Sequence, residues 1–424
     1  MLWLHFEANS SISWQLSEER QVCLLTKILF LKTEKLNPNM FGLHRSLFTE
    51  EHDLFRQSVR DFIAREIVPN NAQWEKDKMV SRESWLKFGE NGFLGMQAPE
   101  ELGGLNIQDF RYNAILIEEI GLSGCSGPAI GYPLHSDIVM PYILHYATEE
   151  AKKKYIPKMI TGEYIGAVAM TEPGAGSDLQ GMRSTAEDRG DHYLINGSKT
   201  FITNGYLSDV VVVAAKTDPS KGAKGISLFL VDRNMKGFSK GVPFEKVGLH
   251  AQDTCELFFE DVVVPKENLL GKVGDGFKYL MTELAQERLV VALSAVALGE
   301  FMLISTLDYV KQRKAFGKSI SDFQNTRFKL AEMTAALEQG RIYCDYLVQL
   351  HNEGKLDSAM ASAAKYNMTE LQCKVADECV QLHGGYGYMW EYPVARGWAD
   401  ARVQRIYAGT NEIMKELIAR KILK

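Results

Sequence analysis

Proline is scarce in the C-terminal part of this chain. Of the 12 prolines among 424 residues, only Pro393 follows Pro265. A proline inside a helix removes a backbone hydrogen bond and costs about 3 kcal/mol. The stretch after residue 265 can therefore hold several long, uninterrupted helices.

The six cysteines form no recognisable motif. None belongs to a Cys-x-x-Cys pair, and none lies near a histidine at the spacing of a zinc site. Cysteines placed in this way are typically free and buried, as in proteins of a reducing compartment. The sequence therefore predicts neither a disulfide framework nor a metal site.

Long apolar runs and clusters of basic residues are also missing. No stretch reaches the roughly 18 apolar residues of a membrane span, and Leu289–Gly299 is too short. With 48 basic and 54 acidic residues the formal charge is −6, whereas binding a nucleic-acid backbone requires clustered Lys and Arg. We expect a chain with no transmembrane segment and no nucleic-acid partner.

What the sequence does contain is three stretches of different periodicity. Residues 45–166 show helical spacing interrupted by prolines, residues 167–275 are rich in β-branched runs, and residues 276–424 return to helical spacing. Segregated helices and strands indicate an α+β fold with separate domains. We expect an N-terminal helical domain, a central β-domain of the sandwich or barrel type, and a C-terminal helical bundle.

Residues 1–44 stand apart as an extension or targeting segment. Their charges are mixed, whereas a mitochondrial presequence is rich in Arg and poor in acids. Residues 21–32 have the spacing of a short amphipathic helix. A presequence, a poorly ordered extension and a start at Met40 remain open for this part of the chain.

Cap and turn residues give local predictions. Thr49 and Thr148 each precede acidic residues and an apolar run, which indicates the start of a helix. Asn196-Gly197 separates two strand-like runs, which favours a two-residue hairpin turn. Further strands are expected at 210–215, 226–231 and 256–264, and long helices at 277–310, 322–352, 359–383 and 412–423.

Five segments contain residue types that can hold a ligand. The glycines of Thr171–Asp178 let backbone amides approach an anion, and Phe201–Gly205 places an aromatic ring beside a hydroxyl. Three cations occur in Gln312–Lys318 and three close glycines in Gln381–Gly387, while Arg405–Glu412 opens the last helix. Taken singly, each segment is equally typical of an ordinary turn, strand end or helix cap.

Taken together, in this order and spacing, the five segments resemble the acyl-CoA dehydrogenases. The resemblance runs from about Arg45 to Lys424 and implies an N-terminal helical domain, a central β-domain and a C-terminal four-helix bundle. It further implies a homotetrameric flavoprotein of fatty acid β-oxidation. Such an enzyme oxidises acyl-CoA to trans-2-enoyl-CoA and passes the electrons to electron-transferring flavoprotein.

The resemblance assigns FAD binding to residues in all five segments. Thr171 would contact the pyrimidine side of the flavin, Thr203 would hydrogen-bond flavin N5, and Phe201 would offer a stacking face where many relatives have Trp. Arg313, Gln324 and the glycine-rich turn at residues 381–385 would reach the FAD of a neighbouring subunit. The residues implied to bind the cofactor are Val168, Thr171, Gly176, Ser177, Phe201, Ile202, Thr203, Arg313, Gln324, Gln381, Leu382, His383, Gly384, Gly385, Thr410, Asn411 and Glu412.

The catalytic base is not where most of the family has it. Many relatives have Glu directly before the Gly-Thr of the last motif, where this chain has Ala408. A smaller branch, the long-chain and isovaleryl types, has the Glu near the start of the C-terminal bundle. Glu283 and Glu287 are both candidates there, since they share a helix face and spacing alone does not choose between them. The match of Glu-Arg-Leu implies that Glu287 is the base.

Substrate contacts follow from the same resemblance. The residues implied to contact acyl-CoA are Ser177, Ala285, Gln286, Arg288, Ala408 and Gly409. The backbone N–H of Ala408 would hold the thioester carbonyl. The last helix and Gln286–Leu289 resemble the long-chain type more than the isovaleryl type, but Lys278 stands where the long-chain type tends to have Tyr.

Three other functions remain open on the same fold. One is an isovaleryl or other branched-chain acyl-CoA dehydrogenase, one is an acyl-CoA oxidase-like enzyme, and one is a non-catalytic acyl-CoA-binding protein. The chain length argues against an oxidase, which usually has a second helical domain. The presence of Glu287, Thr203 and Arg313 argues against a non-catalytic protein. By resemblance, we expect the mitochondrial matrix in a eukaryote and the cytoplasm in a bacterium.

Overall fold

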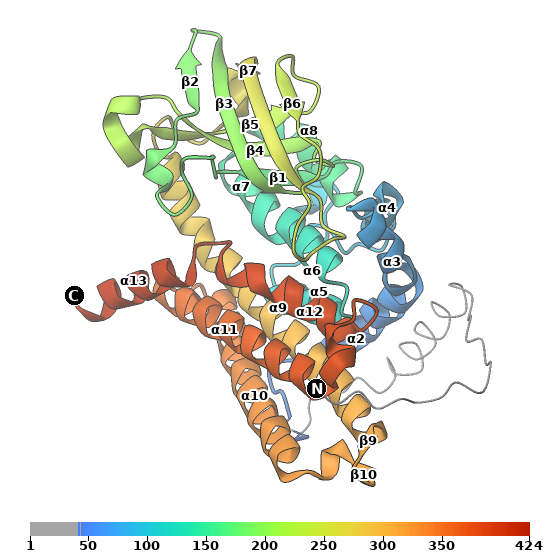
Figure 1. Cartoon of the computed structure of the whole chain (residues 1–424). Helices are drawn as coiled ribbons and strands as arrows, with labels where there is room; N and C mark the ends of the chain where they lie inside the picture. The colour runs from blue at the N-terminus through green and yellow to red at the C-terminus, as the bar shows by residue number, and fades with distance from the viewer. Residues whose placement is uncertain (1–40, 43) are drawn as a thin grey trace, which may run out of the picture. The chain divides into compact units, whose positions relative to one another are not determined.

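Helices, then strands, then helices again follow one another along the chain (Figure 1). The computed structural model describes residues 41, 42 and 44–424. The amphipathic helix expected at 21–32 lies outside the described residues. For the rest of the chain the predicted α+β organisation is confirmed.

The N-terminal helices pack around an aromatic core. Thr148 caps its helix as predicted, because its Oγ1 accepts a hydrogen bond from the N–H of Ala151 at 3.2 Å. Thr49 also begins a helix, and its hydroxyl lies 2.7 Å from Nδ1 of His52. The helices are α2 (Glu50–Phe62), α3 (Val68–Asp77), α4 (Arg82–Glu90), α5 (Phe110–Leu122), α6 (Ser126–Pro133), α7 (Met140–Tyr146) and α8 (Glu149–Ile160), with π-helical turns at Ile63–Ile67 and Leu134–Val139.

The central strands form an eight-stranded sheet within the described residues. Its strands are β1 (Gly166–Ala169), β2 (Thr185–Asp188), β3 (His192–Thr203), β4 (Val210–Lys216), β5 (Ile226–Asp232), β6 (Phe238–Lys240), β7 (Thr254–Pro265) and β8 (Leu269–Leu270). The order is β6-β7-β3-β2-β4-β5-β8, and β1 pairs in parallel with β4. The strands expected at 210–215, 226–231 and 256–264 are all present.

The hairpin turn predicted at Asn196-Gly197 is wrong. β3 continues through both residues and pairs with β7, with a register shift between Ile195 and Gly197. Gly197 has φ 145°, and a Cβ there would meet the side chain of Ser184 at 2.2 Å. The glycine therefore permits a β-bulge and a close contact rather than a chain reversal. The actual turn lies between β2 and β3, next to Gly190 (φ 93°).

Long helices make up the C-terminal part, as the scarcity of proline predicts. They are α9 (Gly276–Gln312), α10 (Gln324–Asn352), α11 (Ser358–His383), α12 (Pro393–Ala401) and α13 (Asn411–Ile422), with a hairpin of β9 (Lys314–Ala315) and β10 (Lys318–Ser319) after α9. The four predicted helices are confirmed to within two residues. α12 was not predicted, and Pro393 occupies its first turn, where the missing N–H costs nothing.

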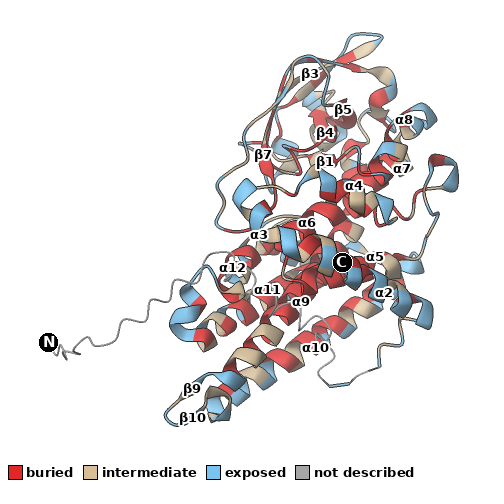
Figure 2. Ribbon diagram, turned by 90° about the vertical axis from the view of Figure 1, so that its right-hand side faces the viewer, coloured by how far each residue is buried: buried red, intermediate tan, exposed pale blue. Residues whose placement is uncertain are grey.

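Helix α9 is the central element of the C-terminal part. It packs against α10 and α11 and also against α5 of the N-terminal part. By length and composition it is the one helix in residues 41–42 and 44–424 that would suffice to cross a membrane, with a mean hydropathy of 2.0 in its most apolar window. However, 89% of that window is buried inside the structure (Figure 2). Packing between helices explains its apolar character.

Candidate active site

Two tyrosines of α7 each donate a hydrogen bond to one of two glutamates of α9. The hydroxyl of Tyr142 lies 2.8 Å from Oε1 of Glu287, and that of Tyr146 lies 2.8 Å from Oε1 of Glu283. The two tyrosines are four residues apart on α7, and the two glutamates are four residues apart on α9. Each set therefore lies on one face of its helix. The structure therefore gives each of the two acids, which helical spacing alone does not distinguish, its own phenol.

Glu287 is a buried carboxyl with few compensating partners. Its exposed fraction is 4%, and Tyr142 is its hydrogen-bond donor. Burial raises the pKa of Glu287 and so does the charge of Glu283, whereas Tyr142 and Arg288 lower it; together these effects leave the pKa at about 7. A carboxylate with this pKa is a stronger base than one in water. At neutral pH a fraction of the molecules has Glu287 in the ionised form, which is the form that accepts a proton.

Glu283 is held more firmly than Glu287. Its Oε1 meets both Tyr146 and Nδ1 of His145, the latter at 3.0 Å. The ring of Tyr146 stacks on Tyr279 with centroids 4.1 Å apart. The carboxylate of Glu283 raises the pKa of His145, which favours a charged pair. Of the two acids, Glu287 is therefore the one with fewer bonds to break before it reacts.

Arg288 follows Glu287 but points toward α11. Its Nη1 donates to the hydroxyls of Ser358 at 2.8 Å and Ser362 at 3.3 Å, and its buried Nε has no partner among the described residues. Burial lowers the pKa of Arg288. A buried guanidinium with an unused donor suits a further anionic or polar ligand.

The segment that contains Ala408 is fixed by a buried lysine. Nζ of Lys365 donates to the carbonyl of Gly409 at 2.8 Å and to Oδ1 of Asn411 at 3.0 Å. Ala408 has φ 51° and Gly409 has φ 91°. A non-glycine residue in this region costs about 1 kcal/mol or more, so the surrounding contacts hold an unfavourable backbone conformation where the substrate carbonyl is expected.

The predicted flavin segments after β1 and at the end of β3 lie side by side. The N–H of Thr200 donates to the carbonyl of Thr171 at 2.9 Å, and Nζ of Lys199 donates to the carbonyl of Met170 at 3.1 Å. Asn204 links the end of β3 to β1 through the carbonyl of Gly166. The tertiary structure thus joins two segments that are about 30 residues apart in sequence.

The residues of this region fit a flavin. Phe201 has φ 59° and is 68% exposed as a residue, so a stacking face is available. The hydroxyls of Thr171, Ser177 and Thr203 have no hydrogen-bond partner within the described chain. A Cβ at Gly176 would meet nothing within 4 Å, so the backbone there is open to a ligand. By contrast, Ile202 is buried in the sheet core, and Val168 is half-buried on β1.

A second group of predicted cofactor residues lies at the far end of α9. Gly276 at the start of α9 packs against Ile226 and Ser227 of β5. Arg313 follows the last residue of this 37-residue helix, about 55 Å away at 1.5 Å per residue. Its guanidinium lies 5.8 Å from the ring centroid of Tyr386, beside the open backbone of Gly384 and Gly385. One chain therefore does not bring these residues to its own flavin segments.

The remaining predicted residues divide between these two regions and the core. Gln324 and Gln381 are exposed, Leu382 is half-buried, and His383 is buried against Tyr309 with ring centroids 4.1 Å apart. Thr410 caps α13, since its Oγ1 accepts from the N–H of Ile413, and Glu412 is exposed. Asn411 is buried and bonded to α11. Any contact of Asn411 with a cofactor would therefore use its backbone.

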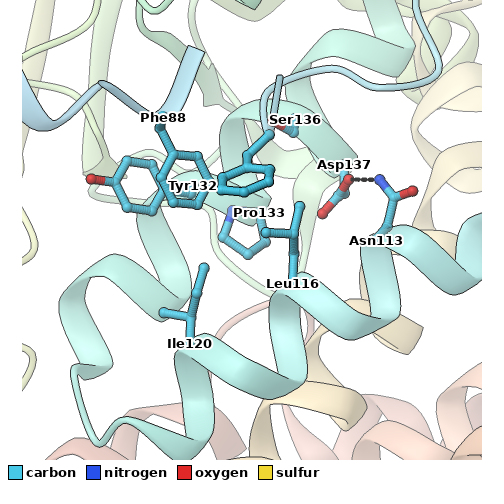
Figure 3. A pocket seen from close by; sticks show the side chains of 9 residues that line it. Phe88, Asn113, Leu116, Ile120, Tyr132, Pro133, Ser136 and Asp137 are labelled. Atoms are coloured by element: carbon cyan, nitrogen blue, oxygen red, sulfur yellow. Dashed lines mark hydrogen bonds between the residues drawn. The ribbon is translucent and has the colours of Figure 1, made fainter. Parts of the chain in front are cut away.

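A small cavity lies in the N-terminal helices next to this site (Figure 3). Aromatic and aliphatic side chains line it, including Phe88 and Leu116, together with one acid, Asp137, whose Oδ1 accepts from Asn113 at 2.5 Å. Burial raises the pKa of Asp137 to about 7. Its backbone carbonyl accepts a hydrogen bond from Gln286, and Oε1 of Gln286 meets His351 at 2.8 Å. The cavity wall is thus tied to the residue before Glu287.

Sequence reasoning missed the α7 residues and Lys365. Tyr142, His145 and Tyr146 occur at helical spacing in a short segment between prolines, which was a usable signal for one polar face. Lys365 gave no signal, because a lysine in a long helix is ordinarily solvated. Among the described residues, no group of three or more His, Cys, Asp or Glu side chains is arranged to hold a metal ion.

Comparison with known proteins covers nearly all of the described chain. Residues 49–163 match the acyl-CoA dehydrogenase N-terminal domain, residues 167–262 its middle domain, and residues 274–423 its C-terminal domain. The chain is 56% identical over 381 residues to the long-chain specific acyl-CoA dehydrogenase, mitochondrial, of Sus scrofa, which covers 89% of this chain and 88% of that protein.

Solved structures agree with this assignment. An acyl-CoA dehydrogenase from Geobacillus kaustophilus superposes with a TM-score of 0.86 at 51% identity, covering 88% of this chain and 98% of that one. A glutaryl-CoA dehydrogenase from Mycobacterium smegmatis, solved in complex with FADH2, gives a TM-score of 0.85 at 28% identity and covers 91% of this chain and 97% of that one. The chain therefore belongs to the acyl-CoA dehydrogenase family of FAD-dependent oxidoreductases.

Proposed function

We propose that this protein is an FAD-dependent dehydrogenase of long-chain acyl-CoA, with Glu287 as the base that removes the α-proton. The observation that carries the assignment is the setting of Glu287, a buried carboxyl bonded to Tyr142 with a pKa of about 7. Ala408, at the alternative position, has no group that accepts a proton. Glu283 is less suitable, since it already accepts two hydrogen bonds.

The chain's own residues account for binding and proton transfer. Thr171, Ser177, Phe201 and Thr203 would hold the flavin, and Ala408 would offer its N–H to the thioester carbonyl. A bound FAD would supply the acceptor for the hydride that leaves Cβ. Glu287 would take the α-proton on Oε2, while the Tyr142 hydroxyl goes on donating its hydrogen bond to Oε1. Hydrogen-bonding the carbonyl stabilises the negative charge that develops as the proton leaves.

The preference for long chains rests on sequence similarity. The Sus scrofa relative is named as long-chain specific, and its 56% identity to this chain supports the same substrate class here. Lys278, where that type tends to have Tyr, is one position at which fine contacts differ. Each buried methylene of the acyl chain contributes roughly 0.8 kcal/mol to binding, so chain length should change affinity steadily.

Partners and location follow the same relatives. We propose electron-transferring flavoprotein as the electron acceptor in fatty acid β-oxidation. A homotetramer is supported by Arg313, which follows the far end of α9 and lies beside Tyr386 of the glycine-rich turn, too far from the start of that helix to serve the flavin of its own chain. The mitochondrial name of the Sus scrofa relative supports the matrix in a eukaryote. For the domains we propose the limits 45–166, 167–275 and 276–424, close to the three matched ranges.

The test is Glu287→Gln in the flavin-loaded protein. The variant should keep its yellow colour but lose turnover by 100-fold or more, roughly the contribution of a general base. Anaerobic palmitoyl-CoA should then no longer bleach the flavin absorbance. Glu332→Gln, an exposed acid on α10, is the control and should behave as wild type. Near wild-type turnover of Glu287→Gln would overturn the assignment.

Graded substrates separate the alternatives. Anaerobic titration of the wild type with acyl-CoAs of increasing length should give the tightest bleaching with long chains. Preferential bleaching by isovaleryl-CoA would instead indicate a branched-chain enzyme. Peroxide formed at the rate of turnover in air would indicate an oxidase, and a colourless protein that binds no added FAD would indicate a non-catalytic binding protein.

A further inference from the structure

We propose that Glu283 and His145 form a positioning pair that sets the strength of Glu287 as a base through the charge that the pair presents to it. This inference rests on the proposed role of Glu287. Neither residue of the pair would touch the reacting atoms. Their effect would pass from His145 to Glu283 and from Glu283 to Glu287.

The contacts give Glu283 one fixed position. His145 and Tyr146 both bind Oε1 of Glu283, at 3.0 Å and 2.8 Å, and they approach from α7 while Glu283 stands on α9. The stacking of Tyr146 on Tyr279 holds the phenol in place. A carboxylate bound in this way keeps its charge at a constant distance from Glu287, one helical turn away, or about 5–6 Å between Cβ atoms.

The two members of the pair differ in their access to water. Glu283 is buried, whereas the side chain of His145 is 56% exposed. His145 can therefore exchange protons with solvent while Glu283 and Glu287 are shielded from it. When His145 is protonated, the pair is close to neutral. When His145 loses its proton, the charge of Glu283 is no longer balanced and acts on Glu287 in full.

The other charged and titratable groups near the acids do not replace this pair. Tyr142 on α7 donates to Glu287 and stays neutral, because burial raises its pKa. Arg288 on α9 is bonded to serines of α11. Lys152 on α8 pairs with Glu149 and lowers the pKa of His145. His351 on α10 feels the charge of Glu283, but burial lowers its pKa to about 4 and keeps it neutral.

The sign of the coupling gives opposite expectations for two substitutions. Glu283→Gln removes a negative charge beside Glu287, so Glu287 should lose its proton at lower pH. His145→Gln removes the balancing positive charge, so Glu287 should lose its proton at higher pH. Since kcat/KM reports the ionisation of the free enzyme, its acid limb should move down by about one pH unit in Glu283→Gln and up by about half a unit in His145→Gln.

The experiment is the pH profile of kcat/KM for the flavin-loaded wild type, the two single variants and the double variant, with palmitoyl-CoA as the probe. In the double variant, the added His145→Gln change should produce a much smaller shift than it does alone, because Glu283 no longer transmits it. Flavin absorbance and the circular dichroism melting curve of each variant verify that it is folded and loaded.

Three outcomes would overturn the inference. A uniform fall in kcat without movement of the acid limb would mean that the pair is only structural. Shifts of the same sign in both single variants would contradict the charge mechanism. Loss of all activity in Glu283→Gln at every pH would make Glu283 the base. The proposed role of Glu287 is tested separately, and it fails if Glu287→Gln keeps its turnover.

Discussion

Glu118 of α5 and Glu287 near the start of α9 are both buried acids, but their hydrogen-bond donors differ in charge. Glu118 of α5 accepts hydrogen bonds from three arginines, Arg45, Arg56 and Arg341, at 2.7–2.9 Å. These cations hold the pKa of Glu118 well below its usual range despite complete burial. Glu287 is equally buried but has a tyrosine as its donor, and its pKa is raised to about 7.

The number of bound cations, rather than burial, separates these acids. Glu300 of α9 is the intermediate case: it shares Arg341 with Glu118, and burial still raises its pKa. Three arginines outweigh the cost of desolvating a carboxylate, and one arginine or a phenol does not. Glu118 therefore serves as a fixed anion that ties the N-terminal part to α10, whereas Glu287 is left able to change its charge.

The largest effect should come from breaking the Glu118 cluster. Glu118→Gln leaves three arginine side chains without their central anion, which should cost about 3–5 kcal/mol of stability. Urea unfolding followed by circular dichroism should show a clear fall in the midpoint. The control is Glu416→Gln, whose partner Arg420 is exposed on α13 and whose loss should cost about 0.5 kcal/mol or less. Equal effects of the two substitutions would contradict the comparison.

A smaller effect of opposite sign is expected for the stability of Glu287→Gln. The folded-state pKa of Glu287, about 7, lies above the ordinary value of 4.5, so ionisation disfavours the folded state. That cost is absent below pH 4.5 and grows as pH rises to about 7. Removing the carboxyl should thus stabilise the protein at pH 8 by up to about 3 kcal/mol and leave it unchanged at pH 4.5. Urea midpoints at both pH values test this, and destabilisation at pH 8 would refute it.

The smallest effect is expected for Tyr142→Phe. The phenol lowers the pKa of Glu287 by hydrogen-bonding its carboxylate, so its loss should move the acid limb of kcat/KM upward by about 0.5–1 pH unit. Activity on the plateau should fall less than tenfold. Tyr155→Phe, which removes another buried phenol that bonds to Asn268, should leave the limb in place. An unmoved limb in Tyr142→Phe would show that the phenol has no electrostatic role.

Local sequence signals predicted the elements well where the cause of structure is local. Thr49 and Thr148 begin helices, because a side-chain hydroxyl satisfies backbone groups within its own turn. The long C-terminal helices follow from the near absence of proline. The Asn196-Gly197 turn failed for the opposite reason. Whether Gly197 reverses the chain or sits in a bulge depends on its neighbours β7 and Ser184, which are distant in sequence.

The candidate site could be predicted only in part. The motif around Glu287 pointed to the start of α9, and the structure gives Glu287 and Glu283 different partners there. Those partners, Tyr142, His145 and Tyr146, come from α7, about 140 residues earlier in the chain. Arg288, expected near CoA, bonds to serines of α11, and its contact with substrate stays a prediction.

By itself the sequence determined the α+β organisation and the family, and it supplied the two acids, Glu283 and Glu287, that are candidates for the proposed base. These properties depend on local propensity, hydrophobic period and motif spacing, which the order of residues contains directly. Only the tertiary structure decided which carboxyl is left without a counter-ion. The pKa of an acid depends on the charges and solvent around it, and those are set by α7, α9 and α10 meeting in space.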